Sequence, residues 1–276
     1  MVASSALRGA SAESLATLDE QLSAALGGAD GTADAARVGD DLFGAAMLLQ
    51  RESALRRTAT DASLDVDARS GLVRQVLEGQ LSATALDLVA KAATLRWTAS
   101  RDMPDALEHL SVVATVRSAP DASDRLADEL FAAAAIVREE PGLRDALADS
   151  ARTAEDRTRL VDDVFGSQAL EATTVLVKRA VTGTYRTVGV ALDEYQKIAA
   201  DVHAERVAVV TVAAPVGDDE LDRLRRALTS QYGRDVHLNV QVDASVIGGM
   251  RVEIGDDVID GTVSARLDEA RRRLAG

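Results

Sequence analysis

The sequence contains no cysteine, so neither a disulfide framework nor thiol chemistry is available to it. Aromatic residues make up only 3% of its 276 residues, whereas apolar residues make up 47%. Alanine, leucine and valine must therefore fill most of the interior. Small apolar side chains of this kind suit closely packed helices, because helix axes can approach each other where the side chains are small.

Basic residues are also in deficit. The chain has 31 lysine and arginine residues against 45 aspartate and glutamate residues, a net charge of −14. This balance argues against a nucleic-acid backbone as the partner, since phosphate binding needs clustered positive charge. The excess acid either keeps the chain in solution or offers an acidic surface to a basic partner helix, and the composition is compatible with both.

Long hydrophobic runs are missing as well. No apolar run reaches the ~18 residues that a membrane span requires. The first residues, MVASSALRGASAESL, lack the basic and then apolar layout of a secretory signal. We therefore expect a soluble cytoplasmic protein that inserts no segment into a membrane.

Residues 1–205 carry the pattern of amphipathic helices. Leu15, Leu18, Leu22 and Leu26 recur at steps of three and four residues, which places them on one face of a helix. The following GGADG ends this helix, because paired glycines and aspartate interrupt helical phasing. Similar spacing recurs until residue 205, so we predict that this part of the chain is entirely helical.

Two stretches of this helical region repeat each other. A shift of 88 residues places DDLFGAAMLLQRESALRRTATD, which begins at Asp40, over DELFAAAAIVREEPGLRDALAD, which begins at Asp128. The same shift aligns Phe43 with Phe131. This period exceeds the ~20 to 50 residues of a solenoid repeat, so we predict two tandem copies of a whole helical bundle.

The two copies are expected to share a helix. Under the same shift, residues 100–114, where a helix is expected near 103–117, align both with the helix at 12–26 and with residues 188–202. The helix near 103–117 would then close the first bundle and open the second. A break between the copies is expected at SAPDAS (118–123), where Pro120 interrupts the helical phasing.

After residue 205 the hydrophobic period changes from that of a helix to two, which indicates strands. Residues 206–215 are rich in valine and end at Pro215, so we predict a strand that ends at this proline. The further elements predicted are a helix at 218–233, a strand at 236–242, a strand at 250–254, a hairpin connection from Gly255 to Asp257 that leads into Val258 and Ile259, and a closing helix from Val263 to Leu274.

Gly248 and Gly249 could suggest a phosphate-binding loop. Such a loop delivers its backbone N–H groups at the start of a helix and is followed by a lysine. Here Met250 follows, and it begins a strand. The glycines are therefore more typical of a bulge, or of a close backbone approach where two strands meet.

Residues that could perform catalysis or bind a metal are scattered along the sequence. His109, His203 and His237 lie on separate predicted elements and have no metal-ligand spacing. The chain has neither a Gly-x-Ser-x-Gly nucleophile elbow nor a Gly-Lys-Ser/Thr phosphate motif. We predict a chain with no catalytic, cofactor-binding or metal-binding residues.

Trp97 and its counterpart Tyr185 each end an apolar helical stretch. They are either core residues or anchors for a helix docked in a groove, since Trp and Tyr are frequent at binding hot spots. The sequence leaves both interpretations open.

The combination of elements resembles a known family. A helical bundle is followed by VAVVTVAAPV, by a helix ending LRRALTSQYG, and by VHLNVQVDASVIGGMRVEIGDDVIDGTVSARLDEARRRL. This is similar to the delta subunits of bacterial F-type ATP synthases, relatives of the mitochondrial oligomycin-sensitivity-conferring protein. The segment 240–274 has the most specific resemblance, and the second bundle resembles the family's N-terminal domain more loosely. An ordinary member has one bundle, so the extra copy resembles the longer subunits of actinobacteria.

The resemblance implies a stator subunit of a proton-translocating ATP synthase, with no catalytic role of its own. Such a subunit sits peripherally on the cytoplasmic face of the cell membrane and links the alpha/beta head to the peripheral stalk. Its bundle would bind an N-terminal helix of an alpha subunit, and its last domain would bind the C-terminal ends of the b subunits. A helical scaffold unrelated to ATP synthase is the alternative.

By analogy with the family's groove between its first and fifth helices, five apolar residues of the second copy are candidates for contact with the alpha subunit, although each fits a plain core equally well. They are Leu107, Leu110, Leu176, Val177 and Ala180. For the stalk the candidates are Ile247, Met250 and Leu267.

The predicted fold is mainly α, with a small α/β domain at the C-terminus. The predicted domains are a first bundle at 1–118 (copy one), a second bundle at 119–205 (copy two) and a β-α-β-β-α domain at 206–276.

Overall fold

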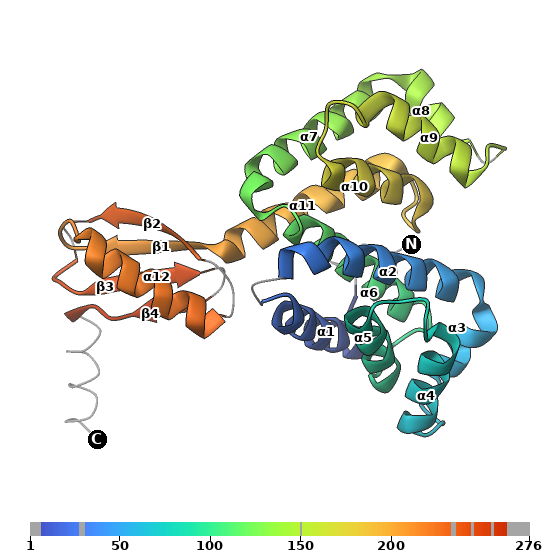
Figure 1. The fold of residues 1–276 in the computed structure, drawn as a ribbon, viewed down its shortest axis with the longest axis horizontal. Helices are drawn as coiled ribbons and strands as arrows, with labels where there is room; N and C mark the ends of the chain where they lie inside the picture. The colour runs from blue at the N-terminus through green and yellow to red at the C-terminus, as the bar shows by residue number, and fades with distance from the viewer. Residues whose placement is uncertain are drawn as a thin grey trace. The chain divides into compact units, whose positions relative to one another are not determined.

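A computed structural model describes residues 7–27, 31–149, 151–232, 236–243, 246–254 and 257–263. The chain forms two compact units, a helical unit at Met1–Ala199 and an α/β unit at Ala200–Gly276. The first is built from helices and the second around a four-stranded sheet (Figure 1). The predicted fold class is therefore confirmed, while the division of the helical part into two separate domains stays a prediction.

Between residues 10 and 206 the described residues form eleven α-helices, with small apolar and leucine side chains on their buried faces. They are α1 (Ala10–Leu26), α2 (Gly31–Arg51), α3 (Ser53–Thr60), α4 (Val66–Leu77), α5 (Ala83–Thr94), α6 (Asp102–Arg117), α7 (Ser123–Glu139), α8 (Pro141–Ala148), α9 (Ala154–Phe165), α10 (Glu171–Thr182) and α11 (Val188–Arg206). A short 3₁₀ turn, Pro120–Ala122, separates α6 from α7 at the predicted break.

The repeat extends to the helix ends. The helices α3, α4 and α5 recur 88 residues later as α8, α9 and α10, with the same bounds. Their caps recur too, since Asp65 before α4 and Thr153 before α9 both accept a backbone N–H of the first turn. Such side-chain acceptors satisfy donors that a helix start otherwise leaves unpaired.

Helix α6 is buried along its whole length. Fourteen of its 16 residues are buried, and it packs against α1, α2, α5 and α10 (Figure 1). A helix covered on all sides has no polar face to show to solvent. The polar side chains of α6 must therefore find partners inside the protein.

The closest packing partner of α6 is α2, and a glycine allows the approach. A β-carbon added at Gly39 would lie 2.7 Å from Oγ1 of Thr115 and 3.1 Å from the carbonyl oxygen of Ser111. The Thr115 hydroxyl is itself held, because it donates to the Ser111 carbonyl at 2.9 Å. A side chain at position 39 would therefore push the two helices apart.

The α/β unit consists of β1 (Val207–Val212), α12 (Asp218–Tyr232), β2 (His237–Val242), β3 (Met250–Ile254) and β4 (Asp257–Asp260). The sheet order is β2-β1-β3-β4. β1 runs parallel to β2 and antiparallel to β3, and β3 runs antiparallel to β4. The predicted order had three strands, so β4 is an additional strand that completes the hairpin expected after β3.

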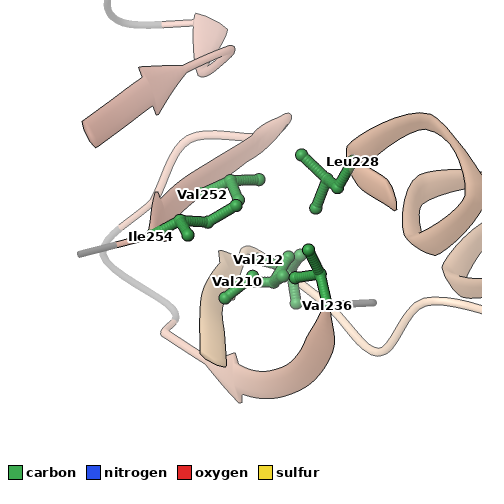
Figure 2. Packing of buried hydrophobic residues seen from close by; sticks show 7 residues of the cluster. Val210, Val212, Leu228, Val236, Val252 and Ile254 are labelled. Atoms are coloured by element: carbon green, nitrogen blue, oxygen red, sulfur yellow. The ribbon is translucent and has the colours of Figure 1, made fainter. Parts of the chain in front are cut away.

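One face of this sheet forms the core of the α/β unit. Side chains that alternate along β1 and β3 point toward α12, as period-two alternation requires. Figure 2 shows this cluster of Val210, Val212, Leu228, Val236, Val252 and Ile254.

Gly248 and Gly249 have positive φ angles of 108° and 82°. A β-carbon at Gly249 would lie 2.5 Å from the carbonyl oxygen of Gly261, and the N–H of Gly261 donates to the carbonyl of Met250. The two segments thus approach as closely as backbone allows, which confirms the role predicted for the glycines. Of the predicted hairpin turn, Gly255 and Asp256 lie outside the described residues, as does the closing helix after Val263.

Two glycines on α2 provide a matched test of this packing. Gly39→Ala should lower the unfolding free energy by about 1 to 3 kcal/mol, because the new methyl group overpacks against α6. Gly44→Ala, where the structure places no atom within 4 Å of the new carbon, should raise it by up to about 1 kcal/mol through helix propensity. Urea unfolding measures both, and equal effects of the two substitutions would contradict the close approach at Gly39.

Candidate partner-binding site

The five residues predicted to line a groove in copy two are all buried. Leu107, Leu110, Leu176 and Val177 have no exposed surface, and Ala180 is 4% exposed. They belong to α6 and α10, which are in contact. That they contact a partner stays a prediction, and a partner helix can reach them only where these two helices leave an opening.

Such an opening lies between α2, α6 and α10. It is a hollow of about 310 Å³ at the C-terminal end of α6 and the N-terminal end of α10. Carboxylates of Asp40 and Glu171 belong to its lining, and small or apolar side chains make up most of the rest. The lining residues are Ala36, Asp40, Thr115, Ser118, Ala119, Leu170, Glu171, Ala172 and Val175.

Arg179 lies beside this hollow and joins the three helices. Its side chain is only 3% exposed. Nη1 donates to the Ser111 carbonyl at 2.7 Å and to Thr115 Oγ1 at 2.5 Å, and Nη2 donates to Asp40 Oδ1 at 2.7 Å. The guanidinium also lies over the Phe43 ring, 5.4 Å from its centroid. Burial lowers the pKa of Arg179, and the hydrogen bond and the charge of Asp40 oppose this effect.

Glu108 is the second buried charge of this region. Its side chain is buried, and its oxygens accept hydrogen bonds from the backbone N–H and the hydroxyl of Thr184 in the α10–α11 connection. Burial raises the pKa of Glu108, while the hydrogen bonds from Thr184 oppose the rise. Glu108 therefore anchors the α10–α11 connection to the middle of α6.

Asp105, one turn before Glu108, is less well paired. One oxygen accepts from Nε2 of Gln50 at 2.7 Å, whereas the other, Oδ2, has no hydrogen-bond partner among the described residues. Burial raises the pKa of Asp105 to about 6, and the nearby negative charge of Asp102 contributes to the rise. Its ionised form is therefore costly near neutral pH.

The aromatic candidates are partly buried and engaged within the chain. The indole N–H of Trp97 donates to the Ala92 carbonyl at 2.9 Å, so the side chain folds back onto the C-terminal end of the preceding helix, α5. Tyr185 packs edge-on against the buried Tyr195, with ring centroids 5.6 Å apart. These contacts fit core residues, and a role as partner anchors stays a prediction.

The stalk candidates differ in exposure. Ile247 is 75% exposed, and Met250 is half-buried against the sheet core. Leu267 lies outside the described residues. Other apolar side chains of the α/β unit are exposed as well, and sequence reasoning did not select them: Val242, Val258, Ile259 and Val263.

Sequence reasoning also missed Arg179, Glu108 and Asp40. A charged residue inside a helical repeat is normally read as part of a solvated face. A usable signal was Gly39, which is an unfavourable residue inside a helix and therefore points to a close contact there.

Two absences concern the described residues only. No group of three or more His, Cys, Asp or Glu residues in this part of the chain is placed to hold a metal ion. Within the same ranges, the helices are either too short or too polar to cross a membrane.

Comparison with known proteins gives consistent results. Residues 112–274 match the family described as ATP synthase delta (OSCP) subunit. The chain is 52% identical to the ATP synthase subunit delta of a Nocardioides species, over 99% of this chain and 98% of the relative. It is 41% identical to the subunit delta of Streptomyces coelicolor, over 98% and 99%. A chain of the Toxoplasma gondii mitochondrial ATP synthase hexamer aligns with 60% of this chain at 15% identity and a TM-score of 0.31, which is too distant to support an argument.

The burial of Asp105 predicts a pH-dependent stability. The folded pKa of about 6 exceeds the ordinary value of 3.8, so ionisation destabilises the folded state as pH rises from about 4 to 6, and the full penalty is present above that range. The difference corresponds to at most about 3 kcal/mol. Asp105→Asn, which keeps a partner for Gln50, should raise the unfolding free energy at pH 8 and change it little at pH 4. A gain of equal size at both pH values would contradict this assignment.

Proposed function

Because the chain belongs to the ATP synthase delta (OSCP) family, we propose that it is the stator subunit that connects the alpha/beta head of a proton-translocating ATP synthase to the b subunits of the peripheral stalk. The observation that carries this proposal is the similarity to delta subunits over nearly the whole chain, both copies of the repeat included. The subunit would be a peripheral part of the complex on the cytoplasmic face of the membrane. It would catalyse no reaction itself.

A stator has to resist torque, and this requires slow dissociation from its partners. Several modest contacts in one chain can raise the overall avidity by ~10² to 10⁴, provided that they engage together. The chain has a helical unit and an α/β unit, so each can hold a different subunit. The buried Arg179, paired with Asp40, and the closely packed α2 and α6 support a helical unit that transmits force with little deformation.

We place the contact with an alpha subunit at the hollow between α2, α6 and α10. An amphipathic helix buries its apolar face in a groove of this kind, and the lining offers the apolar Leu170, Ala172 and Val175. Because Arg179 already pairs with Asp40, Glu171 supplies the negative charge of the lining that suits a basic segment. A helix that enters here would lie close to Leu176 and the other buried candidates of α10.

We place the contact with the b subunits on the α/β unit. All four residues of β4 are exposed, and β4 is an edge strand of the sheet. Exposed edges and apolar side chains are normally covered in an assembled protein. Ile247 is the most exposed large apolar residue of the described chain, which makes it the preferred anchor.

Removal and return of the chain tests the proposed function directly. Membranes that contain the ATP synthase but lack this subunit should retain ATP hydrolysis and lose most ATP-driven proton pumping, because the head then turns with the rotor. Adding back the purified chain should restore pumping, as measured by quenching of a pH-sensitive dye. Full pumping without the chain would refute the stator role, whereas loss of ATP hydrolysis by the isolated head would indicate a catalytic contribution.

The contact with the stalk can be tested with one substitution. Ile247→Asp should weaken binding to the soluble part of the b subunits about tenfold, the effect of losing one central apolar anchor. Leu64→Asp, at an exposed apolar residue of the helical unit, is the control and should leave the affinity unchanged. Calorimetry measures both. Unchanged affinity of the Ile247 variant would remove this residue from the interface.

A further inference from the structure

A stripe on α2, at the edge of its contact with α6, shows how this repeat binds a helix of the next copy. We define the α2 stripe as Gly39, Asp40 and Phe43. Arg179 of α10 donates to the Asp40 carboxylate at 2.7 Å and lies 5.4 Å from the centre of the Phe43 ring. An ion pair and a cation–π contact thus act on the same guanidinium.

By the 88-residue offset, α7 is the counterpart of α2 in copy two, and it contacts α10 as α2 contacts α5. A carboxylate on α2, Asp41, accepts the backbone N–H of Ser82 at the start of α5 at 2.7 Å. The carboxylate 88 residues later, Glu129 on α7, accepts the N–H of Leu170 at the start of α10 at 2.8 Å. The inward faces correspond too, because both helices bury the same five positions: Val38, Leu42, Ala45, Ala46 and Leu49 on α2, and Leu126, Leu130, Ala133, Ala134 and Val137 on α7.

The corresponding outer stripe of α7 is exposed. We define the α7 stripe as Ala127, Asp128 and Phe131, which follow Gly39, Asp40 and Phe43 by 88 residues. All three are exposed, and Phe131 is exposed to 65%. Among the described residues no basic side chain pairs with Asp128, and no cation lies over Phe131. In copy one the arginine that covers Asp40 and Phe43 comes from α10, a helix of the next copy, whereas the helical part after copy two is followed by the α/β unit.

We propose that the α7 stripe is a docking surface for a helix of another subunit that presents an arginine. The guanidinium would pair with Asp128 and lie over Phe131, as Arg179 does with Asp40 and Phe43. An arginine fits better than a lysine, because its planar group can stack on a ring and donate to a carboxylate at once. Ala127 stands where copy one has Gly39, whose added β-carbon would lie 3.3 Å from Nη2 of Arg179, so an arginine beside Ala127 has less room than Arg179 has beside Gly39.

A second copy of this chain is a poor candidate for the occupant. Its own Arg179 is 3% exposed and already engaged by its α2 stripe. The net charge of −14 also opposes association of two identical chains. A basic helix of a different subunit can supply an unengaged arginine and carries the charge opposite to that of this chain.

This inference rests on the proposed assembly with ATP synthase subunits and adds a contact surface separate from the hollow and from the α/β unit.

The first test is hydroxyl-radical footprinting of Phe131 in the free chain and in the purified complex. The reactivity of Phe131 should fall several-fold on assembly, while that of Phe165, which is 7% exposed, stays low in both. Unchanged reactivity of Phe131 in an intact complex would overturn this inference alone, whereas failure to assemble at all would overturn the stator proposal. Protection already present in the free chain would mean that the chain covers the stripe itself, which also overturns the inference.

A photoreactive phenylalanine derivative at position 131 then identifies the occupant within the complex. The cross-linked peptide should come from a different subunit and contain an arginine. A product with a second copy of this chain, or with a segment that has no arginine, would overturn the proposal.

Substitutions test the chemistry of the contact. Asp128→Asn combined with Phe131→Ala should weaken binding to the stripped complex about tenfold or more. Asp163→Asn combined with Val164→Ala is the matched control, because both residues are exposed on α9. Changing the cross-linked arginine to glutamine should cost little in addition once Asp128 is already changed, as expected for two partners of one interaction. Fully additive losses, or equal losses in the control, would contradict the proposed pairing.

Discussion

A buried charge ties the helical unit together. Arg179 connects α10 to α2 across 139 residues of sequence, and its other bonds hold it to α6. A buried guanidinium that loses its partners is costly by several kcal/mol. The three helices therefore cannot separate without leaving a charge unpaired, and Gly39, where α2 approaches α6, lies beside this charge. The same contact binds a helix of copy one to a helix of copy two.

Much of the helical architecture could be predicted because it depends on local patterns. The bounds of α8, α9 and α10 follow from those of α3, α4 and α5 by adding 88 residues. The two copies have similar sequences at these positions, so they form the same helices. The buried polar contacts could not be predicted in this way. Glu108 and Asp105 are acidic residues on a helix, and only the packing of neighbouring helices around α6 decides that they are buried.

The candidate site also combines features that the sequence predicts with features that only the packing decides. Sequence reasoning selected apolar residues of α6 and α10, and these are buried, because an apolar stripe on a helix looks the same whether it faces a core or a partner. Exposure separates the two cases, and it selects residues such as Phe131 and Ile247. Phe43 and Phe131 illustrate the point, since they occupy equal positions in the repeat, yet among the described residues a cation lies over Phe43 and none over Phe131. A repeat therefore predicts the fold of each copy better than it predicts what each copy touches.

The position of α6 between helices of both copies also limits how the length of this polypeptide can change in evolution. A deletion that removes α6 alone takes a packing partner from α1, α2 and α5 of copy one and from α10 of copy two, so it is harmful wherever its ends fall. Loss of one whole period, from α2 to α6, would leave α1 followed by α7 to α11, which keeps six helices in the order of a single bundle. Natural variants of this gene should therefore gain or lose helices five at a time, in steps close to 88 codons, and intermediate lengths should be rare.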